Sequence, residues 1–238
     1  MLKRYALVFA LAFPPCAGAA EALLMVAPLN QAMPLAAFDA GKLNGGIIKD
    51  LSDAIARRAG RRIQYVSVAG DQVASVLRQG KADGVCYVRP FWIDGDFYWS
   101  RPLIPDAELI ASSLDAPVVR SLHDLRDRPV GTITGYRYPR VEQVVGLRFQ
   151  RVDSATMEDN LRKMMDGGTR HTIIGQATLM YQLKVNQGLR LRSDLVFASF
   201  SAQCAFSKHS GLDFASINQA IDSLAADGSV GAILARYR

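Results

Sequence analysis

The sequence predicts an α/β protein of two lobes, each a mostly parallel sheet flanked by helices, joined by two hinge crossings. Short apolar runs alternate with helical patterns in the order βαβαβ, this order occurs twice along the chain, and a pair of helices ends it. Strands that alternate with helices are typical of parallel sheets whose faces the helices cover. With 238 residues, of which 50% are hydrophobic, the chain is long enough to bury the cores of both lobes.

The first twenty residues have the three parts of a secretory signal peptide. Lys3 and Arg4 form a basic start, a short apolar run follows, and small residues end the segment. The apolar run is shorter than the roughly 20 residues that a membrane-spanning helix needs. We expect cleavage after Ala19 or Ala20 and a periplasmic mature protein. A buried N-terminal strand or helix is the alternative.

The cysteines leave two questions open. Cys16 would permit a lipoprotein, although the Phe-Pro-Pro before it is a poor context for lipidation. After export, Cys86 and Cys204 would meet an oxidising compartment, in which disulfides persist. Both lie in apolar, strand-like contexts, so a disulfide and a pair of buried free thiols both fit.

The first unit consists of three strands and two helices. In chain order we expect a strand at 23–27, a loop to 46, a helix at 48–59, a strand at 63–68, a helix from 73 and a strand at 83–88. Apolar residues three and four positions apart predict the first helix, and Gly60 ends it. Asp71 can cap the second helix, which Gly80 ends.

The second unit repeats this order after a linking strand. We expect strands at 109–112, 130–133, 148–152 and 172–174, with helices at 139–145, from 157 and at 177–185. Ser154 can cap the helix that begins near Met157. A strand-like stretch at 196–206 follows. Phe214 then opens a helical pair that Gly228 interrupts.

The apolar faces of the terminal helices need a sheet to pack against. The simplest arrangement is that the chain crosses back and packs these helices on the first unit. We therefore expect a signal peptide at 1–20, lobe 1 at 21–112 and 205–238, and lobe 2 at 113–204. The two crossings fall near 110–117 and 198–205. In open α/β sheets, ligands bind at the carboxyl ends of the strands, which here places the binding site between the lobes.

Five short strings support a more specific interpretation. They are GKLNGGIIKDL at 41–51, LRQGKAD at 77–83, WSRPL at 99–103, SLHDL with PVG at 121–131, and AADGS at 225–229. In residue pattern and in order along the chain, these strings resemble those of the type II periplasmic solute-binding proteins, in particular the extracellular family that serves polar amino acid ABC transporters. The resemblance implies a binding protein that closes on a small polar ligand, amino-acid-like or an organic acid.

The resemblance also implies partners. We expect a small-molecule ligand, the membrane subunits of an ABC importer and a monomer, with no cofactor, no metal and no enzymatic activity. Without Lys3 and Arg4, 26 basic and 22 acidic residues remain, a net charge of +4. These charges are interspersed and form no basic run, so a nucleic-acid partner is not expected.

The ligand-binding strings of that family carry over only in part. Its members usually hold the ligand carboxylate with T-x-T-x-x-R after the third strand, where this chain has YVRPFW at 87–92. Arg89 takes the place of that arginine by region, because a guanidinium pairs well with a carboxylate. Gln176 stands where members place an acid for the ligand ammonium, and an amide offers no charge. A standard α-amino acid is therefore less expected.

Aromatic residues and a glycine-containing string complete the predicted site. Rings in the stretch 87–99 can wall a cleft, with Tyr87 and Trp92 facing it and Trp99 structural. The string GTITGY at 131–136 leaves a strand and opens a helix, whose free N–H groups attract anions; an ordinary β–α turn is the alternative. The predicted ligand-binding residues are Tyr87, Arg89, Trp92, Thr134, Gly135, Tyr136 and Gln176, with Arg137 as a second cation.

Two other functions remain open. One is a periplasmic sensor or binding protein without a transporter. The other, less expected, is a dehydratase-type enzyme on the same fold, for which Glu108, Glu142 and Glu158 are the available acids. The histidines are scattered and have no metal-type spacing. Asp94-Gly95-Asp96 reads as a turn, because the further ligands of a calcium loop do not follow.

Overall fold

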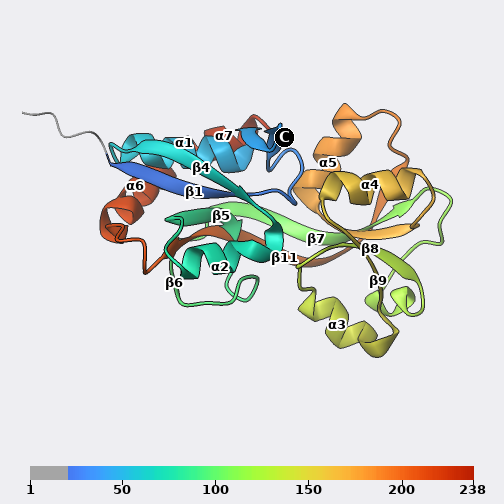
Figure 1. Ribbon diagram of the computed structural model, residues 1–238. Coiled ribbons are helices and arrows are strands. Elements are labelled where there is room, and N and C mark those ends of the chain that lie inside the picture. The colour runs from blue at the N-terminus through green and yellow to red at the C-terminus, as the bar shows by residue number, and fades with distance from the viewer. Residues whose placement is uncertain (1–20) are drawn as a thin grey trace, which may run out of the picture.

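The computed structural model describes residues 21–238, so the predicted signal peptide and Cys16 lie outside the described residues. Two bodies of strands and helices lie side by side, and the long strands β7 and β11 run between them (Figure 1). Within the described residues one sheet has nine strands, in the order β4-β1-β5-β11-β7-β10-β8-β9, with β6 paired to β11. The two-lobed α/β architecture predicted by the sequence is confirmed.

The first body contains three parallel strands and the helices between them. Its elements are β1 (Ala22–Pro28), α1 (Ile47–Arg58), β4 (Arg62–Val68), α2 (Val73–Arg78), β5 (Gly84–Val88) and β6 (Phe97–Trp99). β1 lies between β4 and β5 and is parallel to both. The loop predicted before α1 contains a small hairpin, β2 (Ala37–Asp39) and β3 (Lys42–Gly45). These strands are too short for a sequence period to predict.

The second body repeats this arrangement. Its elements are β7 (Ile104–Ser113), β8 (Pro129–Ile133), α3 (Pro139–Val145), β9 (Gln150–Ser154), α4 (Met157–Met165), β10 (His171–Gly175), α5 (Gln176–Val185) and β11 (Leu191–Ser207). β8 is parallel to β9 and β10, whereas β7 is antiparallel to β10. Helices α4 and α5 pack on one face of this sheet and α3 on the other.

Strands β7 and β11 form the connection between the bodies. They pair antiparallel from Ser113 with Leu191 to Ile104 with Ala202, and β11 then continues along β5. Both strands begin earlier than their apolar runs predict, because ladder hydrogen bonds extend through polar residues as well. The exact residue limits of the two lobes stay a prediction.

The terminal helices return to the first body, as the sequence predicts. α6 (Phe214–Ala226) and α7 (Ser229–Ala235) share a hydrophobic core with β1 and α1. Ile217 and Ile221 of α6 are buried there beside Ile48 and Leu51 of α1. Gly228 separates the two helices in a left-handed conformation that favours glycine.

Two predicted helix caps are wrong. Asp71 lies inside a short 3-10 turn (Gly70–Gln72), and α2 has no side-chain cap. The cap of α4 is Thr156, whose Oγ1 accepts a hydrogen bond from Asp159 N at 3.1 Å. Ser154 is instead the last residue of β9, because β9 ends later than predicted.

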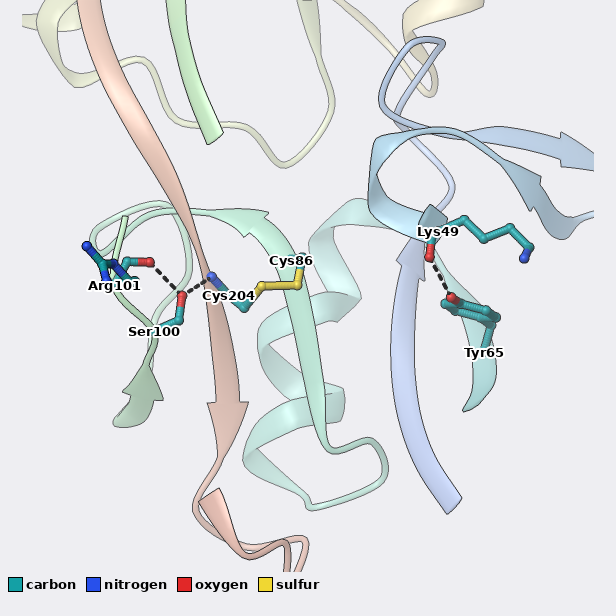
Figure 2. The surroundings of a disulfide bond; sticks show 6 residues. All are labelled: Lys49, Tyr65, Cys86, Ser100, Arg101 and Cys204. Atoms are coloured by element: carbon teal, nitrogen blue, oxygen red, sulfur yellow. Dashed lines mark hydrogen bonds between the residues drawn. A yellow bond between two sulfur atoms is a disulfide. The ribbon is translucent and has the colours of Figure 1, made fainter. Parts of the chain in front are cut away.

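Cys86 and Cys204 form a disulfide, which settles the alternative that the sequence leaves open. They lie opposite each other on β5 and β11, as Figure 2 shows. Ser100 Oγ lies beside the bond, where it accepts from Cys204 N at 2.9 Å and donates to the Arg101 carbonyl at 2.8 Å. The disulfide thus joins the sheet of the first body to a strand that crosses between the bodies.

Candidate functional site

A narrow cavity of about 90 Å³ lies between the two bodies. Its wall combines the loop after β1, the end of β5, the loop after β8, the β10–α5 junction and residues of the crossing strands. The lining residues are Pro28, Asn30, Gln31, Ala32, Leu35, Gly70, Val73, Tyr87, Val88, Trp92, Ile93, Glu108, Gly135, Tyr136, Arg137, Tyr138, Met157, Ile173, Ile174, Gly175, Thr178 and Phe200. The cavity therefore lies where the carboxyl ends of parallel strands from both bodies meet.

Three aromatic rings form one wall. The ring centroids of Tyr87, Trp92 and Phe200 lie 5.1–6.4 Å apart in tilted or edge-on arrangements. Aromatic pairs prefer these geometries, so the rings support one another as a rigid surface. The prediction that Tyr87 and Trp92 face the cleft agrees with this wall, whereas Trp99 is not among the lining residues.

Tyr87 connects the first body to the second. Its φ of 64° is in the left-handed region, which is uncommon for a tyrosine. Its hydroxyl donates to Asp106 Oδ2 at 2.5 Å, and Asp106 Oδ1 accepts from Ala177 N at the start of α5. Burial, followed by the Asp106 carboxylate, holds the pKa of Tyr87 well above its ordinary value. The hydroxyl therefore stays protonated and keeps donating.

Arg89 lies behind the aromatic wall and does not line the cavity. Its guanidinium carbon is 5.4 Å from the Trp92 ring centroid and 4.8 Å from that of Phe200. These are cation–π distances, so Arg89 is held against the rings. In this arrangement Arg89 supports the wall, and its role as a carboxylate-binding residue stays a prediction.

The glycine-containing string contributes Gly135 and Tyr136 to the cavity, but Thr134 does not line it. The helix after the string begins only at Pro139. The N–H groups of Thr134 and Tyr136 donate to the carbonyls of Ser154 and Ile133. These two donors already have partners within the protein, and the anion site that the sequence predicts at this string stays a prediction.

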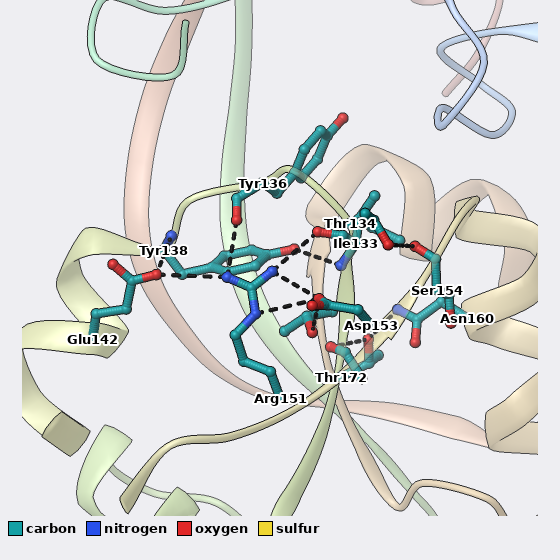
Figure 3. A network of polar contacts seen from close by, with 12 residues as sticks. Ile133, Thr134, Tyr136, Tyr138, Glu142, Arg151, Asp153, Ser154, Asn160 and Thr172 are labelled. Carbon is teal, nitrogen blue, oxygen red and sulfur yellow. Dashed lines mark hydrogen bonds and ion pairs between the residues drawn. The ribbon is translucent and has the colours of Figure 1, made fainter. Parts of the chain in front are cut away.

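A polar network holds this loop in place (Figure 3). Arg151 donates to the carbonyl oxygens of Tyr136 at 3.0 Å and Ile133 at 3.2 Å, and pairs with Asp153. Its guanidinium also lies over the Tyr138 ring, 5.2 Å from the centroid. One arginine thus fixes the backbone on both sides of Gly135 and orients Tyr136 toward the cavity.

Gln176 lies outside the cavity. Its exposed side chain begins α5 and borders a separate surface hollow, together with Pro34, Ile104 and Tyr237. The side chain that lines the cavity from α5 is Thr178, two residues farther on. A ligand-binding role of Gln176 stays a prediction, because its side chain is not among those that line this cavity.

Sequence reasoning missed the polar groups that matter most in the wall. Asn30 follows β1, and Glu108 lies on β7, where the sequence named it only among the acids of the enzymatic alternative. An acid directly before the apolar run that the sequence predicts as a strand at 109–112 was the available signal for Glu108, because removing a charge from water is unfavourable without a functional reason. No signal in the sequence distinguished Asn30.

Contacts across the cavity hold the two bodies together. Gln31 donates to the Tyr136 hydroxyl, Met157 N donates to the Asn30 carbonyl at 3.2 Å, and Arg137 pairs with Asp94. Gly135 has a φ of 80° and packs so closely on Asp71 that an added Cβ would lie 2.9 Å from the Asp71 Cβ. The lobes are therefore closed on each other.

The described residues contain no group of three or more His, Cys, Asp or Glu side chains that could hold a metal ion. The side chains that line the cavity offer aromatic rings, the carboxyl of Glu108, the guanidinium of Arg137 and several neutral polar groups.

No protein-family model matches the chain, and no curated protein matches it in sequence. Solved structures match it in fold. An amino acid ABC transporter substrate-binding protein, AbpA from Streptococcus pneumoniae bound to L-arginine, is 19% identical with a TM-score of 0.74, covering 91% of this chain and 94% of that one.

Two further matches have other descriptions. A histidine kinase sensor domain with similarity to periplasmic binding proteins is 21% identical with a TM-score of 0.75, covering 92% of this chain and 96% of that one. The ancestral amino acid-binding protein AncCDT-1, a precursor of cyclohexadienyl dehydratase, is 16% identical with a TM-score of 0.76, covering 91% and 95%. The chain thus has a periplasmic-binding-protein-like fold, which by itself does not define a function.

Proposed function

We propose that this protein is an exported solute-binding protein that captures a small ligand by closing its two lobes around the cavity. The observation that carries the proposal is a cavity lined from both bodies, with polar side chains that lack partners. A ligand that contacts both bodies binds better when they are closed, so it shifts the equilibrium toward the closed state. Strands β7 and β11 are the hinge in this proposal.

Export and partners follow from the sequence features. The segment 1–20 acts as the signal peptide, and an oxidising periplasm would preserve the disulfide. Residues 21–238 contain no helix that is both long enough and apolar enough to cross a membrane. We infer that the mature protein works as a monomer and delivers its ligand to the membrane subunits of an ABC importer, with a sensory partner as the alternative.

One observation favours enzymatic activity as a second candidate. Glu108 lines the cavity, and burial raises the pKa of its carboxyl, as general acids require near neutral pH. Incubating a bound ligand with the protein and analysing the mixture by mass spectrometry separates the two functions. Recovery of unchanged ligand supports binding alone, whereas a new product that Glu108→Gln abolishes supports the enzyme.

A thermal-shift screen of residues 21–238 tests the binding function. Amines, amino acids, polyamines, organic acids and aromatic acids form the panel. A ligand at about 100 times its dissociation constant stabilises the protein by about 2.7 kcal/mol, which raises Tm by roughly 5–10 °C at this chain length.

Two tryptophan variants give the matched comparison. Trp92→Leu removes part of the cavity wall, and Trp99→Leu changes a half-buried tryptophan outside it. We expect only Trp92→Leu to lose the ligand-induced shift. A folded wild-type protein that no compound stabilises would contradict the proposed function.

A further inference from the structure

Glu108 is a carboxyl without a partner in a largely apolar wall. Its carboxylate has no hydrogen bond or ion pair with any residue among 21–238, although it lines the cavity and feels the charge of Arg89. Its cross-strand neighbours are Gly175 on β10 and Ala198 on β11. These residues are small, so space remains beside the carboxyl. Glu108 is half-buried. A charge that is partly removed from water without a hydrogen-bonded partner is unfavourable, which points to a ligand group that supplies one.

Asn30 is a second polar side chain without a partner. It is 3% exposed, and neither its Oδ1 nor its Nδ2 has a hydrogen-bond partner in the described chain. Gly70 leaves room for the amide, because an added Cβ there would lie 1.8 Å from Asn30 Nδ2. Buried amides are nearly always hydrogen-bonded. The position of Asn30 in the cavity wall therefore calls for a neutral polar group on the ligand, such as a hydroxyl.

Positive charge is scarce in the same wall. Arg137 is the single basic residue among the described lining residues, and its exposed guanidinium already pairs with Asp94. Arg89 is not a lining residue and is held against the rings of Trp92 and Phe200, although its charge acts on Glu108. A ligand carboxylate would therefore enter a cavity that holds a carboxyl and offers no unpaired cation, which is unfavourable.

From these three observations we infer that the ligand is a small amine or ammonium ion that carries a hydroxyl or similar neutral group and no carboxylate. Glu108 supplies the counter-charge and Asn30 binds the neutral group. Aromatic rings beside the carboxyl also favour a cation. The cavity of about 90 Å³ is smaller than a cavity of roughly 150 Å³ that admits benzene, so the ligand has few heavy atoms. This inference rests on the proposed binding function.

Isothermal titration calorimetry with matched probes tests the inference. Ethanolamine is the small cation with a hydroxyl, and in glycine a carboxylate replaces its CH2OH group. The compound 1-propanol has the shape of ethanolamine without its charge. We expect ethanolamine to bind, with glycine and the uncharged alcohol weaker by about tenfold or more. These ligand comparisons need no protein variant, so they remain decisive even if a variant fails to fold.

Two variants assign the charge to Glu108. Glu108→Gln keeps the shape and removes the charge, and we expect it to weaken binding of the cation by about 30-fold or more. Glu21→Gln makes the same change at an exposed residue that pairs with Arg61, far from the lining residues, and should bind like the wild type.

The outcomes separate the ligand class from the proposed function. If glycine binds as tightly as ethanolamine, or if Glu108→Gln keeps full affinity, the inferred ligand class is wrong and the binding function stands. The same conclusion follows if only another class of the thermal-shift panel stabilises the protein. If no compound in either experiment binds the folded protein, both the ligand class and the proposed function are wrong.

Discussion

At the scale of single residues, two acids of strand β7 differ in their hydrogen bonds: one carboxylate has donors within the protein and the other has none. Asp106 accepts hydrogen bonds from the Tyr87 hydroxyl and from Ala177 N. Glu108 has no such donor, and burial raises the pKa of its carboxyl; the positive charge of Arg89 opposes this effect, and Asp106 adds a smaller increase. The difference follows from position, because Asp106 faces the start of α5 and Glu108 faces the cavity.

The raised pKa of Glu108 makes the ligand-free protein sensitive to pH. A carboxyl whose pKa is higher in the folded than in the unfolded state holds its proton more strongly when folded. Its contribution to stability is fully present below the unfolded pKa of about 4.3 and is lost as pH rises through the folded pKa. Glu108→Gln removes this dependence. We expect the Tm of the variant, relative to wild type, to increase between pH 4.5 and pH 7.5.

Thermal unfolding of both proteins across that range, without ligand, measures the difference. Glu21→Gln serves as the control, because its carboxyl is exposed. The other carboxyl groups titrate equally in wild type and variant, so their effects cancel in the comparison. A difference in Tm that stays constant with pH would contradict the assignment.

At the scale of elements, the crossing strands carry the connection between the bodies. β11 pairs with β7 along most of its length and with β5 at its end, where the disulfide closes the pair. Cys86 and Cys204 are both buried in the core of the first body. The bond therefore anchors one end of the hinge strand to a stable sheet.

Removal of the disulfide should lower stability. The bond joins residues 118 positions apart, and closing a loop of this size restricts the unfolded chain strongly. We expect the double variant Cys86→Ala/Cys204→Ala to lose about 2–5 kcal/mol of unfolding free energy. Urea unfolding followed by circular dichroism measures the loss. An unchanged urea midpoint would show that the bond does not stabilise the fold.

At the scale of the whole molecule, closure depends on a glycine that lies between the bodies. Gly135 belongs to the second body and packs on Asp71 of the first. A methyl group at this position would meet Asp71 only when the lobes are closed. The same methyl would also strain the left-handed backbone in every state of the protein.

Gly135→Ala should therefore disfavour closure and weaken ligand binding. Gly146→Ala is the matched control, because Gly146 also has a positive φ but has no atom within 4 Å of its added Cβ. We expect small-angle scattering to show compaction by ligand in wild type and Gly146→Ala, and less compaction in Gly135→Ala. The apparent affinity falls with the fraction of closed protein. Equal affinity in both variants would contradict a role in closure.

The parts of the fold that could be predicted from the sequence are those that a repeating pattern of apolar residues marks. The order of strands and helices, the two-lobed class and the return of the terminal helices followed from apolar periodicity, because each period reports one buried face. The short hairpin before α1 and the cap of α4 were missed, since they depend on single hydrogen bonds rather than on a repeating pattern.

What the sequence by itself determined is the set of elements and the loops that border the cleft; it indicated Tyr87, Trp92, Gly135 and Tyr136 as residues there. Only the tertiary structure decided which polar groups enter the cavity. Arg89 is held behind the aromatic wall by its ring contacts, and Gln176 points to another surface. Asn30 and Glu108 take the polar positions instead. The physical reason is that a side chain's partners come from distant segments, and no local pattern encodes which of them remain unsatisfied.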